Sequence, residues 1–207
     1  MICIIDYGVG NLFSLKSSLA HLGLEAKVSA DAADIRAADR LILPGVGAFG
    51  DAMAKLEATG LVPVIREEAA QKPLLGICLG MQMMNTYFLV AEEAQRRGWS
   101  GTLLALFDQM KKERYMFTEP VDGHWNGHIT RDSVDSFKHP IRVESGSRIE
   151  HLLGGPEILG ASMHNYRITH PAAALRVTGR TADGTIEALE YGDQMLGVQF
   201  HPEANGG

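Results

Sequence analysis

The sequence has few of the features that secreted or membrane-embedded proteins need. Only two of its 207 residues are cysteines, Cys3 and Cys78, so a disulfide framework is excluded and a reducing compartment is favoured. No apolar run reaches the ~18 residues of a membrane span, and the first residues, MICIIDYG, show no secretory signal. We therefore expect a cytoplasmic protein without a membrane partner.

Positive charge is also scarce. The formal net charge is -6, whereas proteins that bind nucleic acid generally carry a basic face. The one dense basic run, KKER at 111–114, is more typical of a solvated surface, so we expect no nucleic-acid partner. Because no repeat and no Pro/Gly/Ser-rich linker divides the chain, we predict one domain over residues 1–207.

The first 80 residues alternate between short apolar runs and amphipathic stretches. The pattern predicts strands at 2–6, 25–29, 40–44 and 73–77, with helices at 12–23, 33–39 and about 61–71. Residues 45–60 are predicted to form a glycine-rich loop that enters a further helix. Such alternation indicates an α/β fold with an open, mainly parallel sheet flanked by helices. In these sheets, binding sites lie beyond the carboxyl ends of the strands.

The second half has a different pattern. Residues 98–140 look loop-like, and several short strand patterns follow them. Two of these, RVTGRT at 176–181 and TIEALEY at 185–191, flank the turn signal ADG, which predicts a hairpin. We therefore expect antiparallel strands added to the parallel core.

Cys78 lies between two glycines in GICLG, directly after a predicted strand and before a helix. This is the thiol form of a nucleophile elbow, in which bulkier neighbours would clash. The free N–H groups and the dipole of the following helix favour a thiolate, and the Leu79 N–H could donate to an oxyanion. The alternative is a buried structural cysteine.

A nucleophilic cysteine needs a base, and the base needs an orienting group. The segment GVQFHPE delivers His201 to the end of an apolar strand, with Glu203 two residues further on. The glycine-rich loop after the third predicted strand could complete an oxyanion hole through the N–H groups of Gly45, Val46 and Gly47. By itself, that loop could equally be a plain strand-to-helix turn.

Metal and cofactor signals are weak. His124 and His128 have i,i+4 spacing, but they lack the glutamate of a zinc-protease helix and lie in a glycine-rich segment. Thiol chemistry needs neither a metal nor an organic cofactor, so we expect none.

Three motifs together, PGVGAFGDAM, GICLGMQ and GVQFHPE, resemble the class I (triad) glutamine amidotransferases in order and spacing. The resemblance implies their flavodoxin-like fold and a triad of Cys78 as nucleophile, His201 as base and acid, and Glu203 as orienter. It also implies that glutamine is hydrolysed through a γ-glutamyl thioester and that ammonia passes to a synthase partner. The residues expected to hold the oxyanion or the glutamine are Gly47, Leu79, Gln82, His164, Asn165 and Tyr166.

Within that family, residues 1–82 look most like the glutaminase subunit of imidazole glycerol phosphate synthase, which would make a cyclase subunit the partner in a heterodimer. HWN at 124–126 is loosely similar to a loop of that subunit. The later segments look more like the γ-glutamyl-γ-aminobutyrate hydrolases, also called peptidase C26. The chain stops four residues after Glu203, and the family usually continues into a last helix, which we expect this domain to lack.

Three functions stay open at this point. The first is a glutaminase subunit that serves a synthase of histidine biosynthesis. The second is a freestanding hydrolase of small γ-glutamyl amides. The third is a catalytically weak relative or a binding module.

Overall fold

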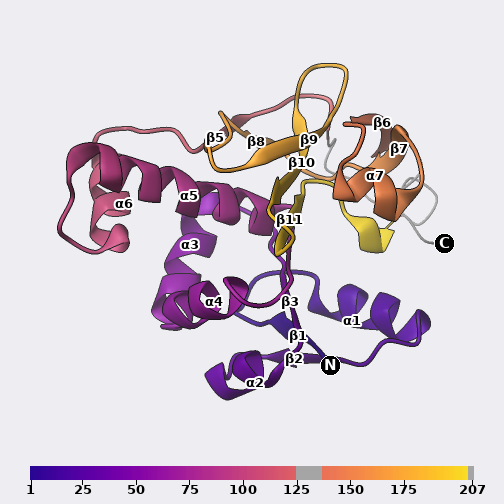
Figure 1. Cartoon of the computed structure of the whole chain (residues 1–207), viewed down its shortest axis with the longest axis horizontal. Coiled ribbons are helices and arrows are strands. Elements are labelled where there is room, and N and C mark those ends of the chain that lie inside the picture. Colours follow the sequence, from indigo (N-terminus) through magenta and orange to yellow (C-terminus); the bar gives the residue numbers. More distant parts are fainter. Residues whose placement is uncertain (125–136, 205–207) are drawn as a thin grey trace.

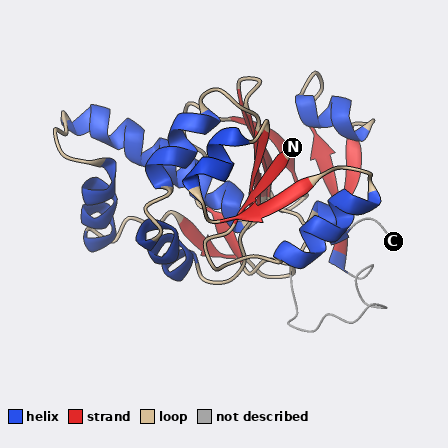
Figure 2. Cartoon of the chain, turned by 90° about the horizontal axis from the view of Figure 1, so that it is seen from below, coloured by secondary structure: helices blue, strands red, loops and turns tan. Residues whose placement is uncertain are grey.

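One nine-stranded sheet runs through both halves of the chain (Figures 1 and 2). The computed structural model describes residues 1–124 and 137–204. The sheet order is β2-β1-β3-β4-β11-β10-β9-β6-β7, and β5 pairs with β8 in a separate two-stranded ribbon. The strands are β1 (Ile2–Ile5), β2 (Ala26–Ser29), β3 (Arg40–Leu43), β4 (Leu74–Ile77), β5 (Thr118–Pro120), β6 (Lys138–Val143), β7 (Glu157–Ala161), β8 (Tyr166–Ile168), β9 (Arg176–Arg180), β10 (Ile186–Tyr191) and β11 (Met195–Val198).

Helices cover both faces of this sheet. They are α1 (Leu12–His21), α2 (Ala32–Ala37), α3 (Phe49–Ala58), α4 (Val62–Ala69), α5 (Leu79–Arg97), α6 (Leu103–Lys112) and α7 (Arg148–Leu153). Figure 1 shows α1 and α7 on one side of the sheet and α3 to α6 on the other. Among the helices of the described residues, none combines the length and the apolarity needed to cross a membrane.

The parallel part of the sheet is buried on both faces. In β1, Cys3 and Ile5 join the core beneath α2 to α6, whereas Ile2 and Ile4 join the core beneath α1 and α7. Successive side chains of a strand point to opposite faces, so a strand between two helical layers must be apolar throughout. This explains the uninterrupted apolar run ICII and confirms the predicted α/β class.

The prediction that residues 98–140 are loop-like is wrong for part of that range. Helix α6 lies there, and its buried Leu106, Phe107 and Met110 have helical spacing and face the core. The Thr102 side chain accepts a hydrogen bond from the Ala105 N–H and caps the first turn. The scattered glycines and prolines of this range obscured one well-capped helix.

The predicted hairpin is confirmed, since β9 and β10 are antiparallel neighbours. Their register shifts around Glu187, which lies at an irregularity between Ile186 and Ala188. Strand β11 then pairs antiparallel with β10 and parallel with β4. The last strand of the described residues therefore lies beside β4, the strand that directly precedes Cys78.

Candidate active site

Cys78 occupies a strained turn between β4 and α5. Its φ is 53° and its ψ is -108°, a conformation that costs a residue with a side chain of the order of 1–3 kcal/mol. The backbone holds the turn in place, because the Cys78 N–H donates to the Val198 carbonyl over 2.7 Å. Strain of this kind indicates that the position of the thiol, rather than local stability, is what the turn provides.

The two flanking glycines are required by close approach of the backbone. A Cβ atom on Gly80 would lie 1.9 Å from the Leu43 carbonyl oxygen of β3, and one on Gly76 would lie 2.9 Å from the backbone of Gly80. The first turn of α5 therefore lies directly against two strands. This confirms the expectation that larger neighbours would clash at the elbow.

His201 is brought to Cys78 by β11. The His201 N–H donates to the Ala161 carbonyl over 2.9 Å, and its Nδ1 lies 2.9 Å from Oε1 of Glu203. Burial opposes the charged imidazolium, but hydrogen bonds with Cys78 and Glu203 outweigh it and raise the pKa of His201 to about 10. Because Nδ1 faces the carboxylate, Nε2 is left to serve the thiol.

Gln199 also contacts the thiol, although we did not predict this contact from the sequence. Its Nε2 donates to the Cys78 sulfur over 3.4 Å, and its Oε1 accepts from Nε2 of Gln82 over 3.1 Å. Both glutamines are buried. One signal was available: in LGVQFH, Gln199 is a polar residue in an apolar run, two positions before His201, a spacing that places both on one face of an extended segment.

The glycine-rich loop after β3 lies against the start of α5. A Cβ on Gly45 would lie 2.7 Å from both the Leu79 Cβ and the Tyr7 hydroxyl oxygen, and that hydroxyl donates to the Pro44 carbonyl over 2.7 Å. Gly47 has a φ of 92°, which favours glycine, and Val46 is exposed. The structure thus brings Gly45 to Leu79, with Tyr7 as a support that the sequence did not reveal.

The residues expected to bind glutamine divide into two groups. Gln82 donates to the Tyr166 carbonyl over 3.1 Å, which ties α5 to β8, and Asn165 and Tyr166 are exposed. The His164 side chain is buried, with its Nδ1 facing the Tyr166 carbonyl and its Nε2 lying 3.1 Å from Glu187 Oε1. Trp125, Asn126 and His128 lie outside the described residues.

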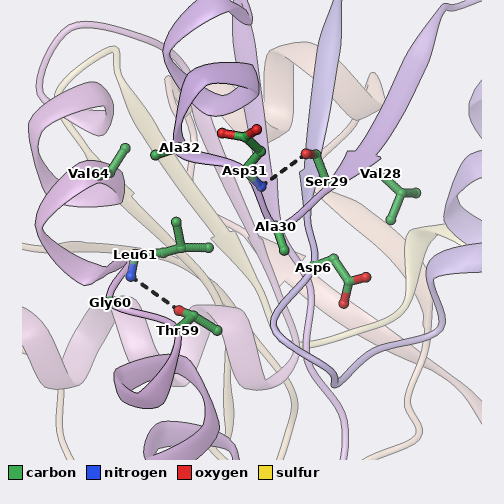
Figure 3. Close-up of a pocket in the computed structure, with 10 residues that line it drawn as sticks. All are labelled: Asp6, Val28, Ser29, Ala30, Asp31, Ala32, Thr59, Gly60, Leu61 and Val64. Carbon is green, nitrogen blue, oxygen red and sulfur yellow. Dashed lines mark hydrogen bonds between the residues drawn. The ribbon is translucent and has the colours of Figure 1, made fainter.

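A surface pocket lies elsewhere, at the carboxyl ends of β1 and β2 (Figure 3). Its walls include Asp6, Ser29, Asp31 and Thr59, and the Ser29 and Thr59 hydroxyls accept hydrogen bonds from nearby backbone N–H groups. None of Cys78, His201 and Glu203 lines it. The pocket therefore does not belong to the cysteine centre.

Comparison with known proteins identifies the family of this chain. The family model described as Peptidase C26 matches residues 52–203. The imidazole glycerol phosphate synthase subunit HisH of Moorella thermoacetica is 39% identical, over 98% of this chain and 87% of its own. HisH of Streptococcus mutans serotype c is 37% identical, over 100% of this chain and 92% of its own.

Two solved structures are alike in fold. One, from Thermoplasma acidophilum, is described as a subunit of GMP synthase, with a TM-score of 0.64, 19% identity, and coverage of 98% of this chain and 83% of that one. The other is a glutamine amidotransferase from Thermotoga maritima, with a TM-score of 0.61, 12% identity, and coverage of 98% of this chain and 75% of that one. The expected fold is thereby confirmed. The chain belongs to the Peptidase C26 family and to the family of the imidazole glycerol phosphate synthase subunits HisH.

Proposed function

We propose that the protein is a glutamine amidotransferase in which Cys78, His201 and Glu203 form the catalytic triad. The proposal rests on one observation. Cys78, a buried thiol on a strained turn, and His201, whose ring is held by the Glu203 carboxylate, lie just beyond the ends of two neighbouring parallel strands, β4 and β11. A nucleophile, a base and a group that orients the base recur in enzymes whose thiol attacks an acyl carbon. The membership of the HisH family supports the same activity.

The proposed reaction has two halves. The Cys78 thiolate attacks the side-chain amide carbon of glutamine, and the His201 imidazolium gives its proton to the departing ammonia. A γ-glutamyl thioester forms as the C–N bond breaks. Neutral His201 then takes a proton from water, which attacks the thioester and releases glutamate and the thiol. Glu203 fixes the ring orientation in both halves.

The oxyanion formed in each half needs two donors. The Leu79 N–H, at the start of α5, is aimed along the helix axis where negative charge is favoured. The loop packed on Leu79 supplies the second, with the Gly47 N–H as the proposed donor and Gly45 and Val46 as its support. Gln82, Asn165 and Tyr166 would position the glutamine directly, and His164 would do so indirectly, by holding the Tyr166 backbone through its carbonyl.

A synthase partner follows from the family. The relatives are named as subunits of imidazole glycerol phosphate synthase, so we propose that this chain pairs with the cyclase subunit in a heterodimer, where it supplies ammonia for histidine biosynthesis. Both halves of the chain contribute strands to one sheet, which supports a single catalytic domain.

The test is ammonia release from glutamine by the wild type and by Cys78→Ala, each measured with the cyclase subunit present or omitted. We expect weak activity of the isolated chain, clear stimulation by the cyclase, and loss of activity in the folded variant. Retention of activity by Cys78→Ala would contradict the triad.

A second candidate function is hydrolysis of small γ-glutamyl amides. The match to the Peptidase C26 model over residues 52–203 favours it. Faster turnover of γ-glutamyl amides than of glutamine, unaffected by the cyclase, would establish this alternative in place of the synthase role.

A further inference from the structure

A second cluster of titratable side chains lies in the antiparallel half of the molecule. It contains His124, His139, His164 and Glu187, and one ligand atom from each lies within 4.8 Å of all the others. They come from four separate segments: the stretch after β5, strand β6, the stretch between β7 and β8, and strand β10. Three of the four side chains are buried, and Glu187 is 0% exposed. The proposed reaction does not use this cluster.

Two of the imidazoles present an unprotonated nitrogen to the cluster. His164 Nδ1 lies 3.0 Å from the Tyr166 carbonyl, which can only accept, so Nδ1 carries the proton and Nε2 has a free lone pair. Likewise, His124 Nε2 lies 3.2 Å from the Asp183 carboxylate, which leaves the lone pair of Nδ1 facing inward.

Such pairs of contacts are the usual surroundings of metal-binding histidines, whose second ring nitrogen donates to a carbonyl or carboxylate. The two inward atoms, His124 Nδ1 and His164 Nε2, are only 3.2 Å apart. With these tautomers neither nitrogen donates to the other, and a cation between them would account for their approach.

The hydrogen bonds within the described residues leave the cluster incompletely satisfied. The Ser162 hydroxyl is 2.9 Å from His124 Nδ1, and any hydrogen bond that it donates there would be given up when an ion takes the lone pair of that nitrogen. Neither ring nitrogen of His139 has a hydrogen-bond partner there, and neither has Glu187 Oε2. A buried carboxylate without its full set of partners is costly, and this one points at three imidazoles.

We propose that His124, His139, His164 and Glu187 bind one divalent transition-metal ion of the zinc type. A tetrahedral ion with ligand distances of about 2.0–2.1 Å separates its ligand atoms by about 3.3–3.4 Å. Glu187 Oε1 lies 3.1, 3.6 and 3.7 Å from His164 Nε2, His124 Nδ1 and His139 Nε2. Three imidazoles and one carboxylate form a donor set that suits such ions.

The ion would have a structural role. It would join β6 and β10 to the stretch that precedes β8, and Gln82 holds β8 through the Tyr166 carbonyl. From the spacing of His124 and His128 alone, we expected no metal. The proposed site uses His124 with three partners that are distant in sequence, and it leaves the thiol chemistry free of metal.

The experiment measures metal content and affinity in the full chain without an affinity tag. Cys78→Ser is the common background, because a thiolate beside His201 could itself bind zinc. Zinc bound after dialysis is counted by elemental analysis, its affinity is measured by competition with a chelator, and cobalt is added to the apoprotein to record its visible absorption. None of these readouts depends on glutaminase activity.

The test variants are His139→Ala and Glu187→Gln, and the control is His151→Ala, which removes an exposed histidine outside the cluster. We expect one zinc per chain, intense cobalt bands of a tetrahedral site, and at least a 10-fold loss of affinity in both test variants, since even outer-shell changes cost about 10–100-fold. His151→Ala should match the background.

His139→Ala is the more decisive of the two variants, because its ring has no hydrogen-bond partner among the described residues and its removal should leave the fold intact. Circular dichroism checks this. Failure of the background protein to bind zinc, or equal affinity in the folded His139→Ala protein, would overturn the proposal.

Discussion

Gly80→Ala tests whether close backbone approach at the elbow positions the thiol. The added Cβ would lie 1.9 Å from the Leu43 carbonyl oxygen and 2.9 Å from its carbon. Both are backbone atoms of β3, so no side chain can rotate away, and the start of α5 must move by about 1 Å or more to restore an ordinary contact. Overpacking of a core costs about 1–3 kcal/mol and occasionally more, and we expect a loss near 3 kcal/mol here.

The same movement would displace Cys78, which immediately precedes α5. A misplacement of about 1 Å can reduce a rate about 100-fold, so kcat for ammonia release should fall by that order. Urea unfolding followed by circular dichroism gives the loss of stability, and the ammonia assay gives kcat below the unfolding transition.

Gly50→Ala is the matched control. Gly50 lies in helix α3, and a Cβ there meets nothing within 4 Å. Alanine in place of glycine in a helix stabilises by about 0.5–1 kcal/mol, so this variant should be at least as stable as the wild type and equally active. If Gly80→Ala were as stable and as active as Gly50→Ala, the steric explanation of the elbow would be refuted.

Three further predictions concern the neighbours of the thiol. Glu203→Gln should lower kcat by roughly 1,000- to 10,000-fold, as loss of the orienting carboxylate does in a serine triad, while KM for glutamine changes little; a small change in kcat would contradict the orienting role. The pKa of His201 is raised from 6.5 to about 10, so its charged form stabilises the fold fully below pH 6.5 and that stability is lost as the pH rises to about 10. The urea concentration at the unfolding midpoint should therefore fall as the pH rises from 6.5 to about 10, and it should fall less in Glu203→Gln. Gln199→Leu removes the donor to the Cys78 sulfur. A hydrogen bond to a charged group is worth about 1.5–3 kcal/mol, so kcat should fall at least about 10-fold. If turnover and the rate at which Cys78 is alkylated were both unchanged, this contact would have no role.

Local signals in the sequence predicted the elbow well. The order strand, glycine, cysteine, glycine, helix depends on residues adjacent in the chain, and the positive φ of Cys78 and the tight surroundings of Gly76 and Gly80 are its direct consequence. The pair His201 and Glu203 is equally local, being two residues apart. Helix α6 was missed although its apolar spacing and its Thr102 cap were present, because the turn-forming residues around it made the whole range look loop-like.

Contacts between distant segments could not be predicted. Gln199 meets Cys78 across 121 positions, and Tyr7 supports Pro44 across 37. The cluster of His124, His139, His164 and Glu187 depends on how β6 and β10 pair and on where the register of β10 shifts. No periodicity within one segment carries that information.

The sequence alone determined which reactive groups this protein has: a thiol at a strained turn, an imidazole at a strand end and a carboxylate two residues further on. It did so because turns and strand ends are set by adjacent residues. The tertiary structure decided that β11 pairs with β4, so that His201 reaches Cys78, and that four distant side chains meet around Glu187. Strand pairing joins segments whose separation along the chain leaves no local trace, and only the packed sheet could reveal these contacts.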